Sequence, residues 1–387
     1  MKMKKLFGSY LSIALVSACM LTACDKDHDI DSDEKDKALA VVVEQYVNKT
    51  VIPTYKSLAD ESLNLYAAIE TFKGDKTDAN LKKVTDQWIK TRKFWELSEA
   101  FLFGPVADFG IDPHIDTWPL DETAFLRLIN NQGDIASMDS ENGDVWVDEH
   151  LGNALLGFHG IEFIFFKDGK VKSASDVKNN ELIYALAVSG DLRNQCVRLE
   201  AAWAGYDKVS KEKQDLIDDR ELVITSSVSS IPYGENMINA GQAGSTYRTI
   251  KAAADAIVDG CVVIADEVGQ MKIGNAHRGD DPNYLESPYS YNSLVDFEDN
   301  IASIQNAYLG GADNNNRGKS LSEYIKSVDS DVDTKVKAKA ENAIAKIRAI
   351  PFPFEKNFGS KQAGEAMDAC DELIEALEDA AKALSQS

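Results

Sequence analysis

Apolar residues recur along this chain at the three- and four-residue spacing of amphipathic helices, and no segment shows the strong alternation of a half-buried strand. The pattern predicts helices over residues 38–72, 78–103, 121–130, 145–166, 179–206, 247–273, 293–309, 320–328, 334–350 and 361–384. Pro53 is expected to kink or split the first helix, and Gly104-Pro105 to end the second. The fold class is therefore predicted to be all-α.

Two helical-bundle halves are expected within the 387 residues. A charged segment at 208–214, short of apolar residues, marks the boundary between a half at 38–207 and a half at 208–387. Long helices end in a similar way at Phe101-Leu102-Phe103-Gly104 and at Tyr308-Leu309-Gly310. This likeness suggests an internal duplication.

The N-terminus has the pattern of a lipoprotein signal peptide over residues 1–23. Three early lysines precede a mostly apolar run at 6–21, and Leu21-Thr22-Ala23-Cys24 matches the site at which such peptides are cleaved before a lipidated Cys. Cys24 is the expected lipid anchor; a plain secretory signal with a chance Cys is the alternative. The acidic residues 24–37 predict a disordered tether. We expect a cell-envelope protein held on the outer membrane, at its periplasmic face or at the cell surface.

The net charge of the chain limits the kinds of ligand that it can bind. The chain has 41 basic and 64 acidic residues and a formal net charge of −23. Such a surface repels nucleic acid and tolerates cations, so nucleic-acid binding is excluded and a cationic ligand is weakly favoured. The cysteines outside the N-terminal segment lie far apart without C-x-x-C spacing, and we expect them to be buried thiols: Cys196, Cys261 and Cys370.

The most informative stretch is 151–166, which reads LGNALLGFHGIEFIFF. From Leu155 onward, His159 and Glu162 are its only polar side chains. Three residues apart on a helix, they lie on one face, and an ionised carboxylate in such an apolar setting must be paired, protonated or bound to a cation. Either they are a hydrogen-bonded structural pair or they belong to a site. Gly157 and Gly160 suggest that a neighbouring backbone or a ligand comes close.

Further charged residues sit at helical spacing elsewhere. Arg92, Glu96 and Glu99 share one face of the second helix, where Arg92 and Glu96 could form an ordinary ion pair and Glu99 lies among apolar residues. Asp116, in the irregular segment 106–119, either caps the next helix or faces the site. His114 is interpreted as a surface loop residue.

In the second half, Ser293 and Asp296 begin the helix at 293–309. They form either its N-cap and first-turn acid, or, if the two halves meet face to face, part of the site. The loop at 274–289 is long enough to be functional.

Three blocks of this sequence resemble the imelysin family. They are G-F-H-G-I-E-F at 157–163, the W-x-x-x-R-x-x-W-E-x-S-E-x-F-x-F-G-P pattern ending at Pro105 together with I-D-x-W-P, and S-x-x-D-F…N-x-Y-x-G from Ser293. The family includes secreted proteins first described as metallopeptidases, iron-uptake lipoproteins and iron-regulated envelope proteins. The resemblance implies an all-α envelope protein with two bundle halves, a site near His159 and Glu162, and iron-uptake envelope proteins as partners.

The favoured function is metal-linked binding in iron acquisition. The expected ligands are His159, Glu162 and Glu99, with Glu96 or Asp116, and ligand contacts are expected from Arg92, Ser293 and Asp296. Mixed nitrogen and oxygen ligands suit iron, zinc or manganese, and the family resemblance favours iron.

Two other functions stay open. A metallopeptidase is one, although no H-E-x-x-H is present and position 163 is Phe, so that H-x-x-E-H also fails. A glycan- or peptide-binding module without metal is the other, lined by Arg92, Asp296 and the loop at 274–289.

Overall fold

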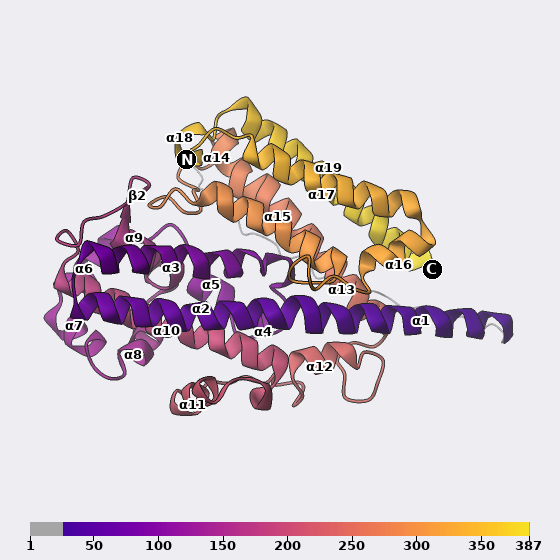
Figure 1. Cartoon of the computed structure of the whole chain (residues 1–387), viewed down its shortest axis with the longest axis horizontal. Coiled ribbons are helices and arrows are strands. Elements are labelled where there is room, and N and C mark those ends of the chain that lie inside the picture. Colours follow the sequence, from indigo (N-terminus) through magenta and orange to yellow (C-terminus); the bar gives the residue numbers. More distant parts are fainter. Residues whose placement is uncertain (1–25, 387) are drawn as a thin grey trace, which may run out of the picture.

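The computed structural model describes residues 26–386, and helices make up almost all of the regular structure in that range (Figure 1). The strands within it are β1 (Phe166–Lys167) and β2 (Lys170–Val171), which pair antiparallel as a short hairpin. The all-α prediction is therefore confirmed. The predicted signal peptide and Cys24 lie outside the described residues, and they stay predictions.

The helices up to the middle of the chain are α1 (Lys26–Tyr46), α2 (Ile52–Gly74), α3 (Asp78–Glu96), α4 (Pro105–Asp108), α5 (Ile111–Ile115), α6 (Glu122–Asn130), α7 (Gln132–Met138), α8 (Gly143–His150), α9 (Gly157–Phe165), α10 (Asn179–Ala204), α11 (Lys211–Asp219) and α12 (Tyr233–Ile238). The later ones are α13 (Ile250–Asp266), α14 (Gly274–Arg278), α15 (Ser293–Leu309), α16 (Leu321–Val328), α17 (Ser330–Arg348), α18 (Phe354–Asn357) and α19 (Lys361–Gln386). Short 3₁₀ turns are η2 (Glu99–Phe101), η3 (Asn153–Leu155) and η4 (Tyr206–Lys208), and π-helical turns are η1 (Val47–Val51) and η5 (Glu267–Ile273).

One long rod of α1, η1 and α2 runs along the molecule (Figure 1). Its buried face includes Val43, Val47, Tyr55 and Leu58, which follow the predicted helical spacing. Pro53 lies in the first turn of α2, directly after the π-helical turn, so the chain passes the proline without breaking the rod. The predicted tether at 24–37 is helical from Lys26 onward, because it continues the helix of α1.

The first bundle forms where α2 packs on α3 and α10, and α6, α7 and α8 pack against the outer side of α10. Large aromatic side chains fill its centre, among them Trp88, Trp95 and Trp203. Helices α11 and α12, beyond the predicted boundary at 208, also pack on α10. The C-terminal group of helices that pack on one another therefore begins with α13.

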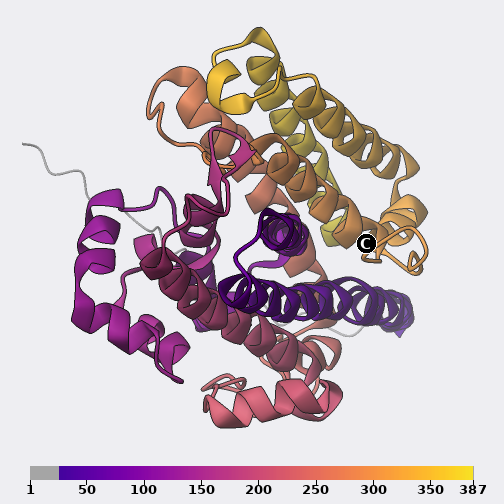
Figure 2. The ribbon, with the colours of Figure 1, turned by 60° about the vertical axis from the view of Figure 1, so that its left-hand side comes forward.

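The second bundle consists of α13, α15, α17 and α19, with α16 closing one end. It meets the first bundle along α3 and η2, which contact α15 and α13. Figure 2 shows α2 and α3 between the magenta helix α10 and the orange helices of the second bundle. Residues from both halves therefore meet at the end of α3.

Some predicted boundaries were wrong. Residues 131–144, which lie outside the predicted helices, contain α7, because Asn131 caps a short helix by accepting hydrogen bonds from Gly133 and Asp134. The segment 106–119 contains α4 and α5. The stretch at 145–166 is α8, the turn η3 and α9 rather than one helix, because Leu151, Gly152 and Leu156 have extended backbones.

Candidate metal centre

Helix α9 carries His159 and Glu162 into the interior. Gly157 starts the helix with φ +69°, and a Cβ added there would overlap the carbonyl oxygen of Ile115. A Cβ on Gly160 would overlap the hydroxyl of Tyr184. The two glycines therefore allow a backbone and a side chain to approach closely, as the sequence suggested.

Glu162 is anchored by the loop that precedes α15. Its Oε1 accepts hydrogen bonds from the backbone N–H groups of Tyr289 and Ser290, at 3.1 and 2.7 Å, and from the Ser290 hydroxyl at 2.7 Å. Its Oε2 lies 3.1 Å from Nδ1 of His159. Glu162 is fully buried. This carboxylate therefore links the two halves and has its hydrogen-bond partners in place.

His159 is held between two carboxylates. Its Nδ1 faces Glu162, and its Nε2 lies 3.0 Å from Oδ1 of Asp116. Burial lowers the pKa of His159, but the hydrogen bonds with Asp116 and Glu162 outweigh it and raise the pKa to about 9. At neutral pH the imidazole is therefore a cation that donates from both nitrogens.

Asp116 faces the site and does not cap the next helix. Its Oδ2 accepts a 2.7 Å hydrogen bond from the indole N–H of Trp95, and its Oδ1 pairs with Arg92. The cap of α6 is Asp121, which accepts from Ala124. Burial alone would raise the pKa of Asp116, but the Arg92 guanidinium and the His159 hydrogen bond hold it well below its usual range.

Arg92 is fully buried at the centre of the junction. Its Nη2 lies 2.6 Å from Oε1 of Glu96 and 2.9 Å from Oε1 of Glu286, and its Nε lies 3.8 Å from Oδ1 of Asp296. Burial opposes its charge, but Asp116, Glu96 and the other acids raise its pKa well above the usual value. The predicted Arg92–Glu96 pair exists, but as part of a buried network rather than on the surface.

Ser293 and Asp296 reach the junction from α15. The N-cap position of this helix is Asn292, and its side chain makes no cap hydrogen bond with the helix backbone. Ser293 Oγ accepts from the N–H of Ser287 and donates to Glu355, whereas Asp296 accepts from Ser287 and Asn292. Both side chains are buried. The structure therefore places them within the network rather than at a simple helix cap.

Sequence reasoning missed Lys272 and Glu286. The ammonium of Lys272, 3% exposed, lies 3.1 Å from Glu286 and 3.8 Å from the carboxylates of Glu96, Glu99 and Glu267. Lys272 is the only Lys or Arg between Lys251 and Arg278, in a largely apolar segment, and that isolation was an available signal. Glu286 lies in the segment 274–289, which begins with α14 and is therefore only partly the loop that was expected to line a glycan or peptide site.

Three carboxylates of the network are close enough to bind one cation. One oxygen each from Glu96, Glu99 and Asp116 lie within 4.8 Å of one another. Glu96 accepts a hydrogen bond from Asn300 at 2.5 Å, whereas Glu99, 5% exposed, has no hydrogen bond from any side chain or backbone group within residues 26–386. Carboxylate oxygens suit hard and borderline metal ions, so this donor set fits a metal.

Acidic groups outnumber basic ones in this interior. The buried carboxylates are Glu96, Glu99, Asp116, Glu162, Glu286 and Asp296. Among residues 26–386, the buried cations that face them are Arg92, Lys272 and protonated His159. Burial raises the pKa of Glu96 and of Glu99 well above the usual value, and raises that of Asp296 to about 6. The excess negative charge is therefore neutralised by protons or by a bound cation.

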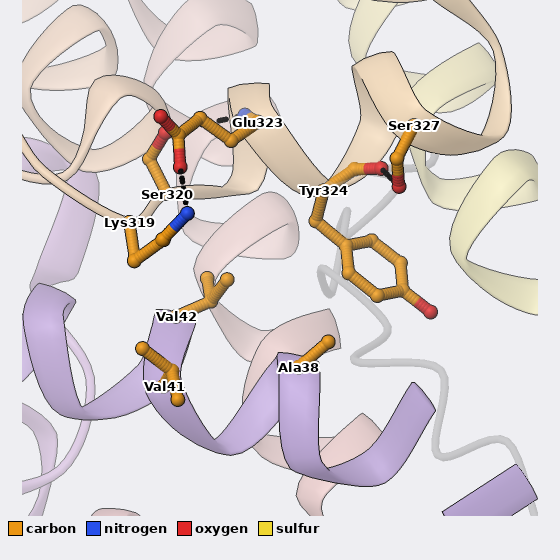
Figure 3. Close-up of a pocket in the computed structure, with 8 residues that line it drawn as sticks. All are labelled: Ala38, Val41, Val42, Lys319, Ser320, Glu323, Tyr324 and Ser327. Atoms are coloured by element: carbon orange, nitrogen blue, oxygen red, sulfur yellow. Dashed lines mark hydrogen bonds and ion pairs between the residues drawn. The ribbon is translucent and has the colours of Figure 1, made fainter. Parts of the chain in front are cut away.

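Two other places in the described structure have features of ligand or metal sites: a surface hollow and a His–Asp pair. The hollow in Figure 3, between α1 and α16, is lined by Val41, Val42 and Tyr324, and its acid Glu323 pairs with Lys319 at 3.3 Å. His114, expected on the surface, is half-buried with Nε2 2.8 Å from Asp191, because α5 packs against α10. Neither place has the unbonded buried acid found at Glu99.

The structure also bears on the state of the cysteines and on whether a helix could span a membrane. Cys196, Cys261 and Cys370 are free and buried, as predicted. Within residues 26–386, none of the helices combines the length and the apolar character needed to cross a bilayer.

Fold and site together define a class: two packed helical bundles with a buried His–carboxylate network at their junction. A profile of the imelysin family matches residues 51–383, and the chain belongs to this family. It is 25% identical over 367 residues to iron-regulated protein A of Synechococcus elongatus, covering 94% of this chain and 88% of the relative.

Two solved structures are similar. One, from Parabacteroides distasonis, is described as a "putative iron-regulated protein A precursor"; it is 27% identical with a TM-score of 0.76, covering 90% of this chain and 95% of that one. The other is an imelysin-like protein from Psychrobacter arcticum, 14% identical with a TM-score of 0.58, covering 90% and 93%. The second likeness concerns the fold alone.

Proposed function

We propose that this protein is a cell-envelope binding protein that holds a metal ion, iron in the first place, at the junction of its two bundles. The observation that carries the proposal is the group of Glu96, Glu99 and Asp116, whose carboxylate oxygens lie within 4.8 Å of one another in a buried interior with excess acid. Iron is favoured because two similar proteins are named for iron regulation.

Glu96, Glu99 and Asp116 are the proposed ligands. Glu99 is the most available of them, because no hydrogen bond within residues 26–386 competes for its oxygens. A metal ion would replace the protons that burial favours on Glu96 and Glu99. Lys272 remains paired with Glu286, its nearest carboxylate at 3.1 Å.

His159 and Glu162 have a positioning role in this proposal. The imidazolium donates to Asp116 and to Glu162, and Glu162 is tied to the loop before α15. Metal ligation needs a neutral imidazole nitrogen, so His159 would become a ligand only after losing its proton. In the arrangement described, it orients the Asp116 carboxylate toward Glu96 and Glu99 and partly balances its charge.

The arrangement of these carboxylates and His159 fits metal binding better than it fits catalysis of peptide hydrolysis. A zinc peptidase keeps three protein ligands and an open position for an activated water, usually with two His one turn apart. Here both nitrogens of His159 face carboxylates, and the group of three carboxylates contains no His. A glycan or peptide module would leave the buried acid excess without an explanation.

The proposed location and partners follow from the sequence. A lipid at Cys24 would anchor the chain to the outer membrane, and residues 24–37 would separate the bundles from it. Other iron-uptake proteins of the envelope are the expected protein partners. Labelling cells with a radioactive fatty acid, with Cys24→Ser as control, tests the anchor; absence of label from the native chain would contradict it.

The metal proposal is tested on untagged protein, stripped with chelator, reloaded with ferrous ion under anaerobic conditions and desalted. Mass spectrometry of the metal should find one ion per chain in the native protein and almost none in Glu99→Gln. Glu323→Gln, which removes the same charge from an exposed position, is the matched control and should keep the ion. Circular dichroism checks the fold of each variant. Equal metal content in the native protein and Glu99→Gln would refute the proposal.

A further inference from the structure

A cavity of about 360 Å³ opens between α13 and the segment around η2. Its walls are mainly apolar and include Leu102, Phe103, Ala256, Val263 and Ile264. Helix α13 comes this close because residue 260 is Gly, where a Cβ would overlap the carbonyl oxygen of Ala100. The mouth is exposed at Val263, which is 63% accessible to solvent.

Two carboxylates, Glu99 and Glu267, also line this apolar cavity. Neither has a hydrogen bond from a side chain or backbone group among residues 26–386. Each lies 3.8 Å from the ammonium of Lys272, which is closer to Glu286 at 3.1 Å. Glu99 is a nine-tenths buried acid that lines a cavity without a hydrogen-bonded partner.

The apolar walls and the two carboxylates select for different parts of one ligand. Removing apolar surface from water favours an apolar body between Phe103 and Val263. The carboxylates favour a cation with N–H donors, because charge-assisted hydrogen bonds are the strongest available in a poorly solvated place. A neutral apolar molecule would offer no hydrogen-bond donor to Glu99 and Glu267, each of which has only the ammonium of Lys272 at 3.8 Å among residues 26–386, and a hydrated ion would leave the apolar walls in contact with water.

We propose that this cavity binds an amphipathic organic cation, a protonated primary amine on an apolar body, with its ammonium between Glu99 and Glu267. The volume of about 360 Å³ suits an aromatic ring with a short alkyl chain. This cavity overlaps the proposed metal centre at Glu99, so the amine and the metal compete for that residue. Failure of metal binding leaves the amine site standing, because Glu267 and the apolar walls are not metal ligands in our assignment.

The test uses chelator-treated protein and isothermal titration calorimetry with 2-phenylethylamine at pH 7. Two matched probes separate the contributions: 2-phenylethanol has the apolar body without the charge, and ethylamine has the charge without the ring. We expect 2-phenylethylamine to bind at least about tenfold more tightly than either probe. Equal binding of 2-phenylethanol, or no detectable heat with any of the three, overturns the proposal.

Single substitutions at and near the cavity test where 2-phenylethylamine binds. Glu267→Gln keeps the shape of the side chain and should weaken 2-phenylethylamine binding about tenfold. Asp266→Asn, at the preceding and exposed position of α13, makes the same charge change and should leave the affinity unchanged. Val263→Lys places a cation at the mouth and should also weaken binding. An equal loss in Glu267→Gln and Asp266→Asn would show that only the general acidity of the surface matters, and that result would refute the site.

Discussion

Nε2 of His159 lies 3.0 Å from Oδ1 of Asp116, a residue 43 positions earlier in the chain. This contact connects the buried helix α9 to the segment that follows α5, and it brings Asp116 within reach of Arg92 and the carboxylates of α3 and η2. The buried pair of His159 and Glu162 on α9 therefore belongs to a larger network that joins the two bundles.

Removal of the His159 charge should cost stability in a pH-dependent way. His159→Gln removes the cationic partner of Glu162 and leaves Asp116 paired with Arg92 alone, and we expect a loss of about 3 kcal/mol near pH 6. The pKa of His159 is raised from 6.5 to about 9, so its contribution is complete below about pH 6.5 and is lost as pH rises through about 9. Urea unfolding of both proteins at pH 6 and pH 9.5 measures the difference.

The difference in unfolding free energy between native protein and His159→Gln should shrink markedly at the higher pH. A difference that stays constant across this range would mean that the imidazole is neutral in the folded protein. The control is His150→Gln on α8, where the side chain is exposed and a change within about 0.5 kcal/mol is expected.

Arg92 should behave as the centre of a coupled network. Arg92→Met leaves Asp116, Glu96 and Glu286 with one buried cation fewer, and we expect a loss of about 3–5 kcal/mol. The double variant Arg92→Met/Glu286→Gln also removes the charge of Glu286. Its loss of unfolding free energy should be about 1–3 kcal/mol smaller than the sum of the losses in the two single variants. Denaturant midpoints of Arg92→Met, Glu286→Gln and the double variant provide the measurement. Simple additivity would show that Arg92 and Glu286 are not coupled.

A side chain at position 157 should destabilise the protein by overlapping the carbonyl group of Ile115, and a substitution at Gly110 separates this effect from that of backbone conformation. Gly157 and Gly110 both have positive φ, +69° and +63°, but only at Gly157 would a Cβ overlap another group, the carbonyl of Ile115. Gly110→Ala should cost about 1 kcal/mol from backbone conformation alone, and Gly157→Ala about 1–3 kcal/mol more. Thermal unfolding of both variants checks this ranking, and equal losses would contradict it.

Metal binding and pH should be linked through Glu96 and Glu99. Burial raises the pKa of both carboxyls, so the metal-free folded protein binds more protons than the unfolded chain, and its stability should fall as pH rises above their ordinary value. In the proposed complex a metal ion would replace these protons, so the gain in melting temperature on adding ferrous ion should be larger at pH 8 than at pH 6.

At a free metal concentration of a hundred times the Kd, the stabilisation at pH 8 should reach about 2.7 kcal/mol. Scanning calorimetry with and without metal provides the measurement. In Glu99→Gln the metal-dependent gain should disappear at both pH values. A gain that is larger at pH 6 than at pH 8 would show that protons and metal do not share these carboxylates.

The sequence by itself determined which residues near one another in the chain share a helix face. His159 and Glu162 lie together because residues three apart share a helix face, and Arg92 and Glu96 pair because residues four apart do. The helix over Ser293–Leu309 has its predicted bounds, because Asn292 and Gly310 delimit a continuous apolar pattern. The all-α class and the buried free cysteines follow from the same kind of local pattern.

Only the tertiary structure decided which distant groups meet. The sequence left Asp116 between two roles, and the packing of α5 near α9 placed it beside His159 rather than at a helix cap. Lys272 and Glu286 were not predicted, because nothing in their own segments shows that Arg92 and Glu96 of α3 lie beside them. A helix periodicity specifies which side chains share a face, whereas the partners of that face depend on how helices from both bundles pack.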